Sequence, residues 1–514
     1  MTPECCGKRM WKNGDVEPNV PRWICGKCGR KTRRAQGPDD SPGYNEAAAE
    51  SRSREIERAA QAGEITRFVI TAAQNNTRTH KGFLRSLERY CQHNRSTLLV
   101  QPIHYKNISL FSGGQQYRKY WARSVQPYLV NQRINLGGNV IVRANINVAA
   151  TAAQPLSGFQ PIEGQSWVII GHPQVAMEPV ASPGGMKPKR VYTTGAVTVR
   201  NYSETKAGAK ADFHHVHGAL AVEIVGDHAF IRELNADSRG RFYDLDGFYT
   251  PTGATFGHRV AALVTGDEHV KFHSPQVRAA TYDAPDSMAA TLKPEKIIRH
   301  DILDGYAGSH HHENDDVTLF RKYWKGDHDY RQELDQVVDF INETTPAGAE
   351  NWIVPSNHDE HLQKWLSRVD PRRDHCNALL IHELKALQYQ DALAGGDSSA
   401  LRLYLQPRLT CKTVFLDRSR PALIGGVDMS QHGDMGVNGS RGSARSLANT
   451  TYKMFIGHSH SARIVMGVHQ VGKSTGALEY ERGLGAHTNT HGIQYRNGKR
   501  TLVDIFDGQW RAAR

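Results

Sequence analysis

The sequence predicts an α/β protein that is preceded by a small cysteine-containing module. Three observations support this prediction. Runs of β-branched and apolar residues, such as Val260–Val264, recur along the chain and alternate with helical patterns. Aspartate, asparagine and histidine directly follow several of these runs. Four of the seven cysteines are concentrated between positions 5 and 28, which is typical of a metal site and not of a disulfide framework.

Length and charge limit the class of protein. A chain of 514 residues with 39% hydrophobic residues can form two to four domains. There is no apolar run of about 18 residues, so we expect no membrane partner. The start M-T-P-E-C-C lacks the basic and apolar regions of a secretory signal. A net charge of +12 favours a polyanionic partner, with nucleic acid first, although a merely basic protein would carry the same charge.

Residues 1–36 are predicted to form a zinc ribbon. The candidate zinc ligands are Cys5, Cys6, Cys25 and Cys28. The second pair has the Cys-x-x-Cys spacing that chelates one ion, whereas the first pair is adjacent, so Cys5 is the weakest of the four candidates. The basic run Arg30–Arg34 favours contact with DNA. A module that docks protein is the alternative.

Residues 37–64 are expected to form a Pro- and Gly-containing linker and then a solvated helix without a deep core face. Residues 65–210 are predicted to form a smaller α/β domain. Its expected elements are strand Arg67–Ala73, helix Thr79–Cys91, and strands Ser96–Pro102, Val140–Val148, Gln165–Gly171 and Thr193–Asn201. This domain contains no complete chemical motif, so structural support, oligomer contact and DNA binding all stay open.

Residues 211–514 contain the residues suited to catalysis. The buried strand at Val260–Val264 leads to Asp267 and His269, which alternate and can therefore point to the same side. Similar residues follow later strands, namely Asp301, Asn357, His358, His432, His458 and His460. Carboxylates and imidazoles suit Mn, Fe or Zn.

The remaining elements of this part complete an α/β arrangement. Helices at Asp327–Asn342 and Cys376–Leu393 are predicted to cover the sheet with their apolar faces. The tail Gly492–Trp510 is predicted to be a hairpin, because Asn497-Gly498 is a strong turn signal between two strands.

The order Asp-x-His, Asp, Asn-His-Asp, His-Gly and Gly-His-x-His resembles the motifs of the calcineurin-like metallophosphoesterase superfamily. The resemblance spans about half the chain and implies an αββα sandwich. In two motifs a glycine beside a ligand is replaced, by His300 and by Ser356, while the ligand itself is kept.

The resemblance also implies the role of each residue. Asp267, His269 and His460 would bind one metal ion, Asn357, His432 and His458 the other, and Asp301 would bridge them. His358 would act on the phosphate as proton donor or charge stabiliser. Two divalent ions about 3.5–4 Å apart activate water and neutralise phosphate oxygens. Mn is expected, with Mg, Fe or Zn as alternatives.

Candidate substrate contacts flank these motifs. They are Arg441, Arg445 and His311. Arginine binds phosphate through paired N–H groups. A solvated basic loop is the alternative for the two arginines.

A narrower resemblance involves Thr193–Tyr202, Lys206–His215, Ser356–Asp359 and Gly457–Ser461. These segments resemble a bacteriophage metallophosphoesterase group that includes a pre-early DNase that degrades host DNA. The expectation is a Mn-dependent DNase that acts in the cytoplasm of the infected host, as a homo-oligomer. The alternatives are a nucleotide phosphodiesterase or phosphatase, and a non-catalytic DNA-binding or DNA-transfer protein.

Overall fold

The structure is a computed structural model. It describes residues 44–105, 120–183, 186–479 and 481–513, and the backbone of five short strands before them. These strands are β1 (Glu4–Cys5), β2 (Lys8–Arg9), β3 (Trp11–Glu17), β4 (Val20–Ile24) and β5 (Lys31–Thr32). The predicted zinc ligands Cys6, Cys25 and Cys28 lie outside the described residues, as does the side chain of Cys5. The zinc ribbon therefore stays a prediction.

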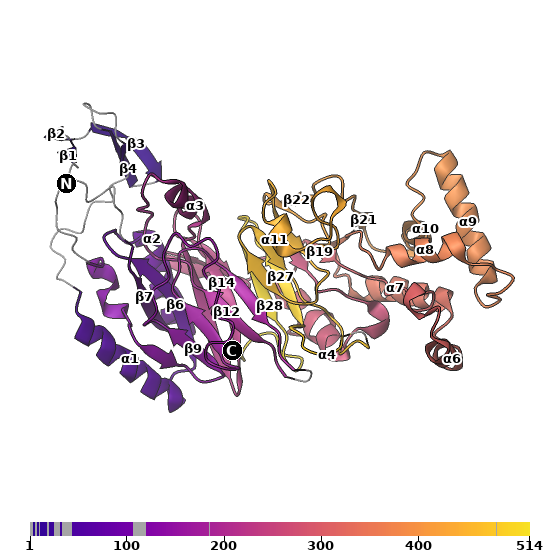
Figure 1. Cartoon of the computed structure of the whole chain (residues 1–514), viewed down its shortest axis with the longest axis horizontal. Helices are drawn as coiled ribbons and strands as arrows, with labels where there is room; N and C mark the ends of the chain where they lie inside the picture. The colour runs from indigo at the N-terminus through magenta and orange to yellow at the C-terminus, as the bar shows by residue number, and fades with distance from the viewer. Residues whose placement is uncertain are drawn as a thin grey trace.

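The described chain is a mixed α/β protein with three large sheets (Figure 1). The first sheet has four strands in the order β14-β13-β6-β7. Their bounds are β6 (Arg67–Gln74), β7 (Thr97–Ile103), β13 (Gly218–Val225) and β14 (His228–Asn235). Helix α2 (Lys81–Asn94) packs on this sheet through Phe83 and Leu87.

Helix α1 (Glu46–Gln61) begins where the Asn45 side chain accepts a hydrogen bond from the Ala48 amide. Its Ile56 and Ala60 are buried in the main core. The expectation of a solvated helix without a core face was therefore wrong. The small alanines hid the apolar face, because they contribute little hydrophobicity to the sequence pattern but allow close packing.

A ten-stranded sheet combines strands from the two halves of the chain. Its order is β22-β23-β24-β26-β25-β11-β12-β10-β9-β8. The earlier strands are β8 (Arg133–Asn135), β9 (Val140–Arg143), β10 (Trp167–Ile170), β11 (Met177–Val180) and β12 (Lys189–Thr193). The later ones are β22 (Leu423–Ile424), β23 (Val427–Asp428), β24 (Lys453–Ile456), β25 (Arg463–Val465) and β26 (Val468–Gln470).

The domain boundary expected at residue 210 does not coincide with a boundary between sheets. Strand β11 pairs with β25 at Met177 and Ile464, and β13 pairs with β6 at Leu220 and Ile70. Sequence patterns could not reveal this sharing, because the periodicity of a strand does not say which partner it will pair with.

The six-stranded sheet has the order β21-β20-β19-β18-β27-β28. Strands β18 (Ala262–Val264), β19 (Lys296–Arg299), β20 (Glu350–Ile353) and β21 (Thr413–Phe415) are parallel. The predicted C-terminal hairpin is present as antiparallel β27 (Thr490–Gln494) and β28 (Arg500–Asp504). A three-stranded sheet contains β15 (Phe242–Asp244), β16 (Gly247–Thr250) and β17 (Gly253–Thr255).

The remaining helices lie mostly beside the six-stranded sheet. They are α3 (Lys206–His214), α4 (Pro275–Arg278), α5 (Met288–Leu292), α6 (Asp316–Lys325), α7 (Tyr330–Thr344), α8 (Glu360–Arg368), α9 (Ala378–Leu393), α10 (Ala400–Leu405) and α11 (Ala444–Leu447). Helices α6 to α10 form the end of the molecule that is farthest from α1 (Figure 1). No helix in the described ranges is both long and apolar enough to cross a bilayer.

Apolar side chains of all three large sheets meet in one core. Val264 and Ile298 of the six-stranded sheet, Phe455 of the ten-stranded sheet and Ile70 of the four-stranded sheet belong to it. A second core, which includes Leu334 and Leu362, lies between the parallel strands and helices α7 to α10. The carboxyl ends of the parallel strands are thereby fixed between two packed layers.

The strand expected at Thr193–Asn201 was wrong over most of its length. Strand β12 ends at Thr193, and beyond it Ala196 and Thr198 form only isolated bridges. Gly195 has a φ of 76°, and a Cβ on it would lie 2.7 Å from the Gly218 Cα. This left-handed turn interrupts the alternation that the sequence suggested.

Candidate metal centre

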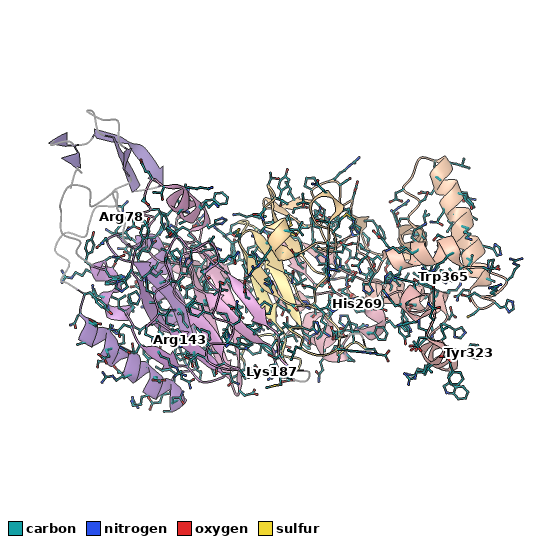
Figure 2. All side chains as sticks on the ribbon, in the orientation of Figure 1. Arg78, Arg143, Lys187, His269, Tyr323 and Trp365 are labelled. Atoms are coloured by element: carbon teal, nitrogen blue, oxygen red, sulfur yellow. The ribbon has the colours of Figure 1, made fainter. Side chains whose placement is uncertain are left out.

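The residues expected to bind metal converge on one side of the fold. Asp267 and His269 follow β18, and Asp301 follows β19. Asn357 and His358 follow β20, His432 follows β23, and His458 and His460 follow β24. Parallel strands present their carboxyl ends at a common edge, which is where α/β proteins bind ligands. Figure 2 labels His269 between the yellow C-terminal strands and Trp365 of α8.

Four of these residues form a buried cluster. Ligand atoms of Asp267, His269, Asp301 and His460 all lie within 4.8 Å of one another. His269 Nε2 is 3.1 Å from His460 Nε2, and His460 Nε2 is 3.4 Å from Asp267 Oδ2. The side chains that sequence analysis assigned to one metal ion therefore lie together with the proposed bridging carboxylate.

The other three residues also lie near Asp301, through His432. His432 Nε2 is 3.1 Å from Asp301 Oδ2, and the rings of His432 and His458 are 5.4 Å apart. His458 Nδ1 is 3.1 Å from Asn357 Oδ1. Asp301 thus contacts a histidine of each set, His269 at 3.6 Å and His432 at 3.1 Å.

The carboxylates of the cluster fit a bound cation. Both carboxylate oxygens of Asp267 and Oδ1 of Asp301 are buried and have no hydrogen-bond partner within the described ranges of the chain. Burying such oxygens without a partner costs several kcal/mol, on the order of 2–7 kcal/mol for a polar group and more for a charge. A divalent ion would satisfy them, and the surrounding imidazoles are suitable further ligands.

The pKa values in the cluster reflect burial and charge together. Burial raises the pKa of Asp267 to about 7. Burial also acts to raise the pKa of Asp301, but the neighbouring His432 and His358 outweigh it and keep that pKa well below its usual range. Burial acts to lower the pKa of His432, but the carboxylates of Asp301 and Asp267 raise it to about 9.

The backbone at the strand ends is strained where it presents the ligands. Positive φ angles occur at His269 (37°), Asp301 (44°), His458 (74°) and His460 (54°). Residues other than glycine adopt this region at a cost of roughly 1–3 kcal/mol each, and such strain is concentrated at functional sites. Four strained residues in one cluster therefore indicate a site rather than four unrelated turns.

Two carboxylates orient the histidines, and sequence analysis assigned no role to either of them. Asp304 Oδ2 is 3.0 Å from His269 Nδ1, and Glu481 Oε1 is 3.0 Å from His460 Nδ1. A carboxylate on the far nitrogen of a metal-binding histidine fixes the ring and its tautomer. The position of Asp304, three residues after Asp301, was a usable signal. No local pattern marks Glu481.

His300 is a third residue whose role appears only in the structure. Its Nδ1 is 3.3 Å from Nδ1 of His432. Burial and the nearby His432 lower the pKa of His300 to about 3, so its ring is neutral and one of its nitrogens can accept a hydrogen bond. The replacement of glycine at this position therefore adds an imidazole beside a candidate ligand and does not displace the ligand.

A cleft of about 730 Å³ opens beside the cluster. His358, His458 and His460 line it together with Arg441, Arg463 and Arg482. The guanidinium groups make the wall of the cleft cationic, which suits an anionic substrate.

The three candidate substrate contacts differ in their surroundings. Arg441 is exposed at the cleft. Arg445 also lines it, but its guanidinium forms an ion pair with Glu178 at 2.8 Å, which occupies the group expected to bind phosphate. His311 does not line this cleft, and its ring packs instead against His310, with ring centroids 3.9 Å apart.

One curated protein is similar over most of the chain. Protein A1 of Escherichia phage T5 is 34% identical over 465 residues, which cover 86% of this chain and 82% of the phage protein. No protein-family model matches the chain. No solved structure matches it either. At this identity and coverage, the chain belongs to the same family as the phage T5 Protein A1.

Proposed function

We propose that the protein is a metal-dependent DNase of the metallophosphoesterase type, with two divalent ions in its active site. The observation that carries this proposal is the pair of buried carboxylates, Asp267 and Asp301, because three of their four oxygens lack a hydrogen-bond partner among the described residues and lie beside the histidines of the cluster. The family relationship to a phage protein supports a phage function.

The residues around the two carboxylates divide into two ligand sets. Asp267, His269 and His460 would hold one ion, and Asn357, His432 and His458 the other, with Asp301 shared. Two such ions neutralise phosphate oxygens and activate water for in-line attack. Mn²⁺ is the proposed ion, because the set mixes carboxylate, amide and imidazole ligands.

His358 is suited to act on the leaving group. Its Nδ1 lies 3.1 Å from the backbone carbonyl oxygen of Asp304, which can only accept a hydrogen bond. Nδ1 therefore carries the proton of the neutral ring, and the His358 side chain lines the cleft. From there a protonated His358 can stabilise a phosphate oxygen or give it a proton.

DNA is the substrate that the charges favour. The chain has a net charge of +12, and Arg441, Arg463 and Arg482 line the cleft beside the cluster. Polyanion binding is dominated by such phosphate contacts. The predicted zinc ribbon would add a further basic surface. We propose action in the cytoplasm of the infected host, as a homo-oligomer.

The test is digestion of plasmid DNA by the purified chain with Mn²⁺, Mg²⁺ or Zn²⁺, on circular and linear substrates. Loss of a general acid lowers the rate about 10²–10⁴-fold, so the His358→Ala variant should cleave DNA more slowly by that factor. Asp301→Ala should abolish cleavage. Asp339→Ala changes an exposed aspartate of α7 and should retain full activity.

Intact DNA with all three metals would contradict the proposal. Hydrolysis of a small phosphodiester under the same conditions would then favour a nucleotide phosphodiesterase. Absence of any bound metal from the wild-type chain would favour a non-catalytic DNA-binding or DNA-transfer protein.

A further inference from the structure

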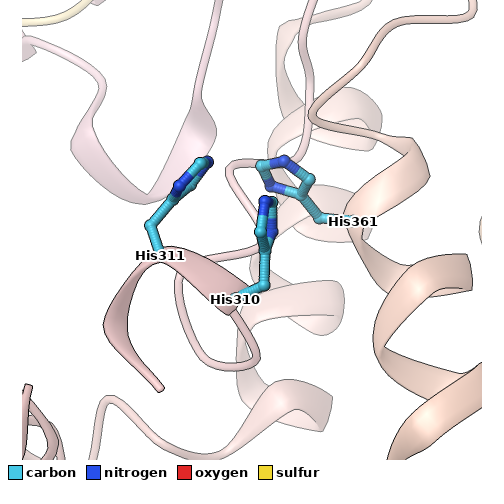
Figure 3. Close-up of side chains that lie close together, drawn as sticks. All are labelled: His310, His311 and His361. Carbon is cyan, nitrogen blue, oxygen red and sulfur yellow. The ribbon is translucent and has the colours of Figure 1, made fainter. Parts of the chain in front are cut away.

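Three histidines lie close together outside the carboxylate cluster. His310 and His311 lie on the short 3₁₀ helix His310–His312, and His361 lies in the first turn of α8. One nitrogen of each ring lies within 4.8 Å of the others. Figure 3 shows the three rings grouped between the two helices. Among the residues that the structure describes, no carboxylate or cysteine belongs to this group.

One backbone carbonyl determines which nitrogen His361 can offer. His361 Nδ1 lies 3.2 Å from the carbonyl oxygen of Asp304, the same oxygen that contacts His358 Nδ1 at 3.1 Å. The carbonyl can only accept, so Nδ1 of His361 is the donor and carries the proton of the neutral ring, and Nε2 is the nitrogen with a lone pair. Histidines that bind metal commonly have their other nitrogen fixed in this way.

The segment that leads to His310 and His311 is held by contacts with two helices, α7 and α8. The buried Glu333 of α7 accepts hydrogen bonds from the amides of Gly305, Tyr306 and Ala307, at 2.7, 3.1 and 2.9 Å. Gly305 lies so close to α8 that an added Cβ would be 2.7 Å from the Cβ of His361. The three rings are therefore presented by two elements that are packed together.

We propose that His310, His311 and His361 form a separate binding site for a divalent transition-metal ion of the zinc class. Three imidazoles and an open fourth position are a known arrangement for zinc, with bonds of about 2.0–2.1 Å. His310 and His311 are exposed and can close onto an ion, while His361 is buried and fixed.

The ligand chemistry separates this site from the carboxylate cluster. Imidazole suits Zn²⁺, Ni²⁺ and Cu²⁺, whereas Mn²⁺ and Mg²⁺ prefer sites with carboxylate or carbonyl oxygens. Mn²⁺ would therefore load the cluster of Asp267 and Asp301 without loading the three histidines. The two sites are neighbours, because the rings of His358 and His361 are 4.7 Å apart.

The test compares zinc content in full-length chains. Each chain is stripped with a chelator, dialysed against excess Zn²⁺ and then against buffer, and analysed for zinc. The double variant His310→Ala/His311→Ala should contain one zinc ion fewer per chain than the wild type. His382→Ala removes an exposed histidine of α9 and should leave the zinc content unchanged.

The same comparison in the Asp301→Ala background separates this site from the proposed active site. There the double substitution should again remove one zinc ion, whether or not the carboxylate cluster binds metal. Equal zinc content with and without the double substitution, in both backgrounds, would overturn the proposal. If the double alanine variant does not fold, as judged by circular dichroism, His310→Gln/His311→Gln replaces it with the same expectation.

Discussion

Gly457 determines how closely the end of β24 can approach the carboxylate at the end of β18. A Cβ on Gly457 would lie 2.1 Å from Asp267 Oδ1 and 3.2 Å from Cγ of His300. Contacts below 3.0 Å force something to move, and here the atom that would move is an expected metal ligand. The position before His458 therefore has room only for glycine. His458 itself has a strained backbone with a positive φ.

We expect Gly457→Ala to reduce metal binding and DNA cleavage together. A displacement of about 1 Å at a reacting centre can cost about 10²-fold in rate. Gly476→Ala is the matched control, because a Cβ there would meet nothing within 4 Å. Metal content and cleavage rate are measured for both variants. Normal metal content and rate in Gly457→Ala would show that Asp267 does not need its present position.

Strands β14 and β28 are joined by a buried acid. Glu233 Oε2 accepts a hydrogen bond from the Leu502 amide at 3.0 Å and one from the Thr501 hydroxyl at 2.8 Å. Burial raises the pKa of Glu233 to about 7, from an ordinary value of 4.5. The folded chain therefore holds a proton that the unfolded chain releases at a lower pH.

The contribution of Glu233 to the free energy of unfolding should be complete below about pH 4.5 and lost as the pH rises through about 7. At 1.36 kcal/mol per unit, the loss is at most roughly 3 kcal/mol. Glu233→Gln mimics the protonated acid, so it should melt at a higher temperature than the wild type at pH 8 and at the same temperature at pH 4.5. Thermal unfolding at both pH values measures this, with the exposed Glu64→Gln as control. A melting difference that is independent of pH would contradict the assignment.

The sheets of the molecule do not follow the domain boundary that the sequence suggested at residue 210. The ten-stranded sheet takes β8 to β12 from residues before 210 and β22 to β26 from residues after 420. The main core likewise contains Ile70, Phe455 and Val264, which are far apart in the chain. The sheets and the core of residues 211–514 are therefore incomplete without residues 65–210, which contain no complete chemical motif.

We expect a fragment of residues 211–514 not to fold cooperatively. It would expose the edge of β25 that pairs with β11 and the edge of β13 that pairs with β6. A fragment of residues 37–514 is the control and should unfold in one steep transition, followed by circular dichroism. Equal melting of the two fragments would mean that the later half is independent.

The N-terminal 36 residues should strengthen DNA binding by charge. Each phosphate contact contributes about 0.9 to the slope of log affinity against log salt. The fragment 37–514 should therefore bind DNA more weakly than the full chain and with a smaller slope, measured by fluorescence anisotropy at several salt concentrations. Unchanged affinity would indicate that these residues dock a protein.

The sequence by itself determined several of the elements and the candidate ligands. Strands such as β6 and β18 and the hairpin of β27 and β28 follow from local periodicity and turn residues, which need no knowledge of the fold. Asp267, Asp301 and His460 could be singled out for the same reason, because each follows a recognisable strand.

Only the tertiary structure decided which groups meet. The contacts of Glu481 with His460, of Arg445 with Glu178, and of β11 with β25 join residues that no local pattern connects. The burial of α1 and the pairing across residue 210 were decided in the same way. The physical reason is that strand pairing and side-chain packing depend on how well surfaces from distant parts of the chain fit together. The periodicity of the sequence shows only which side of an element is apolar.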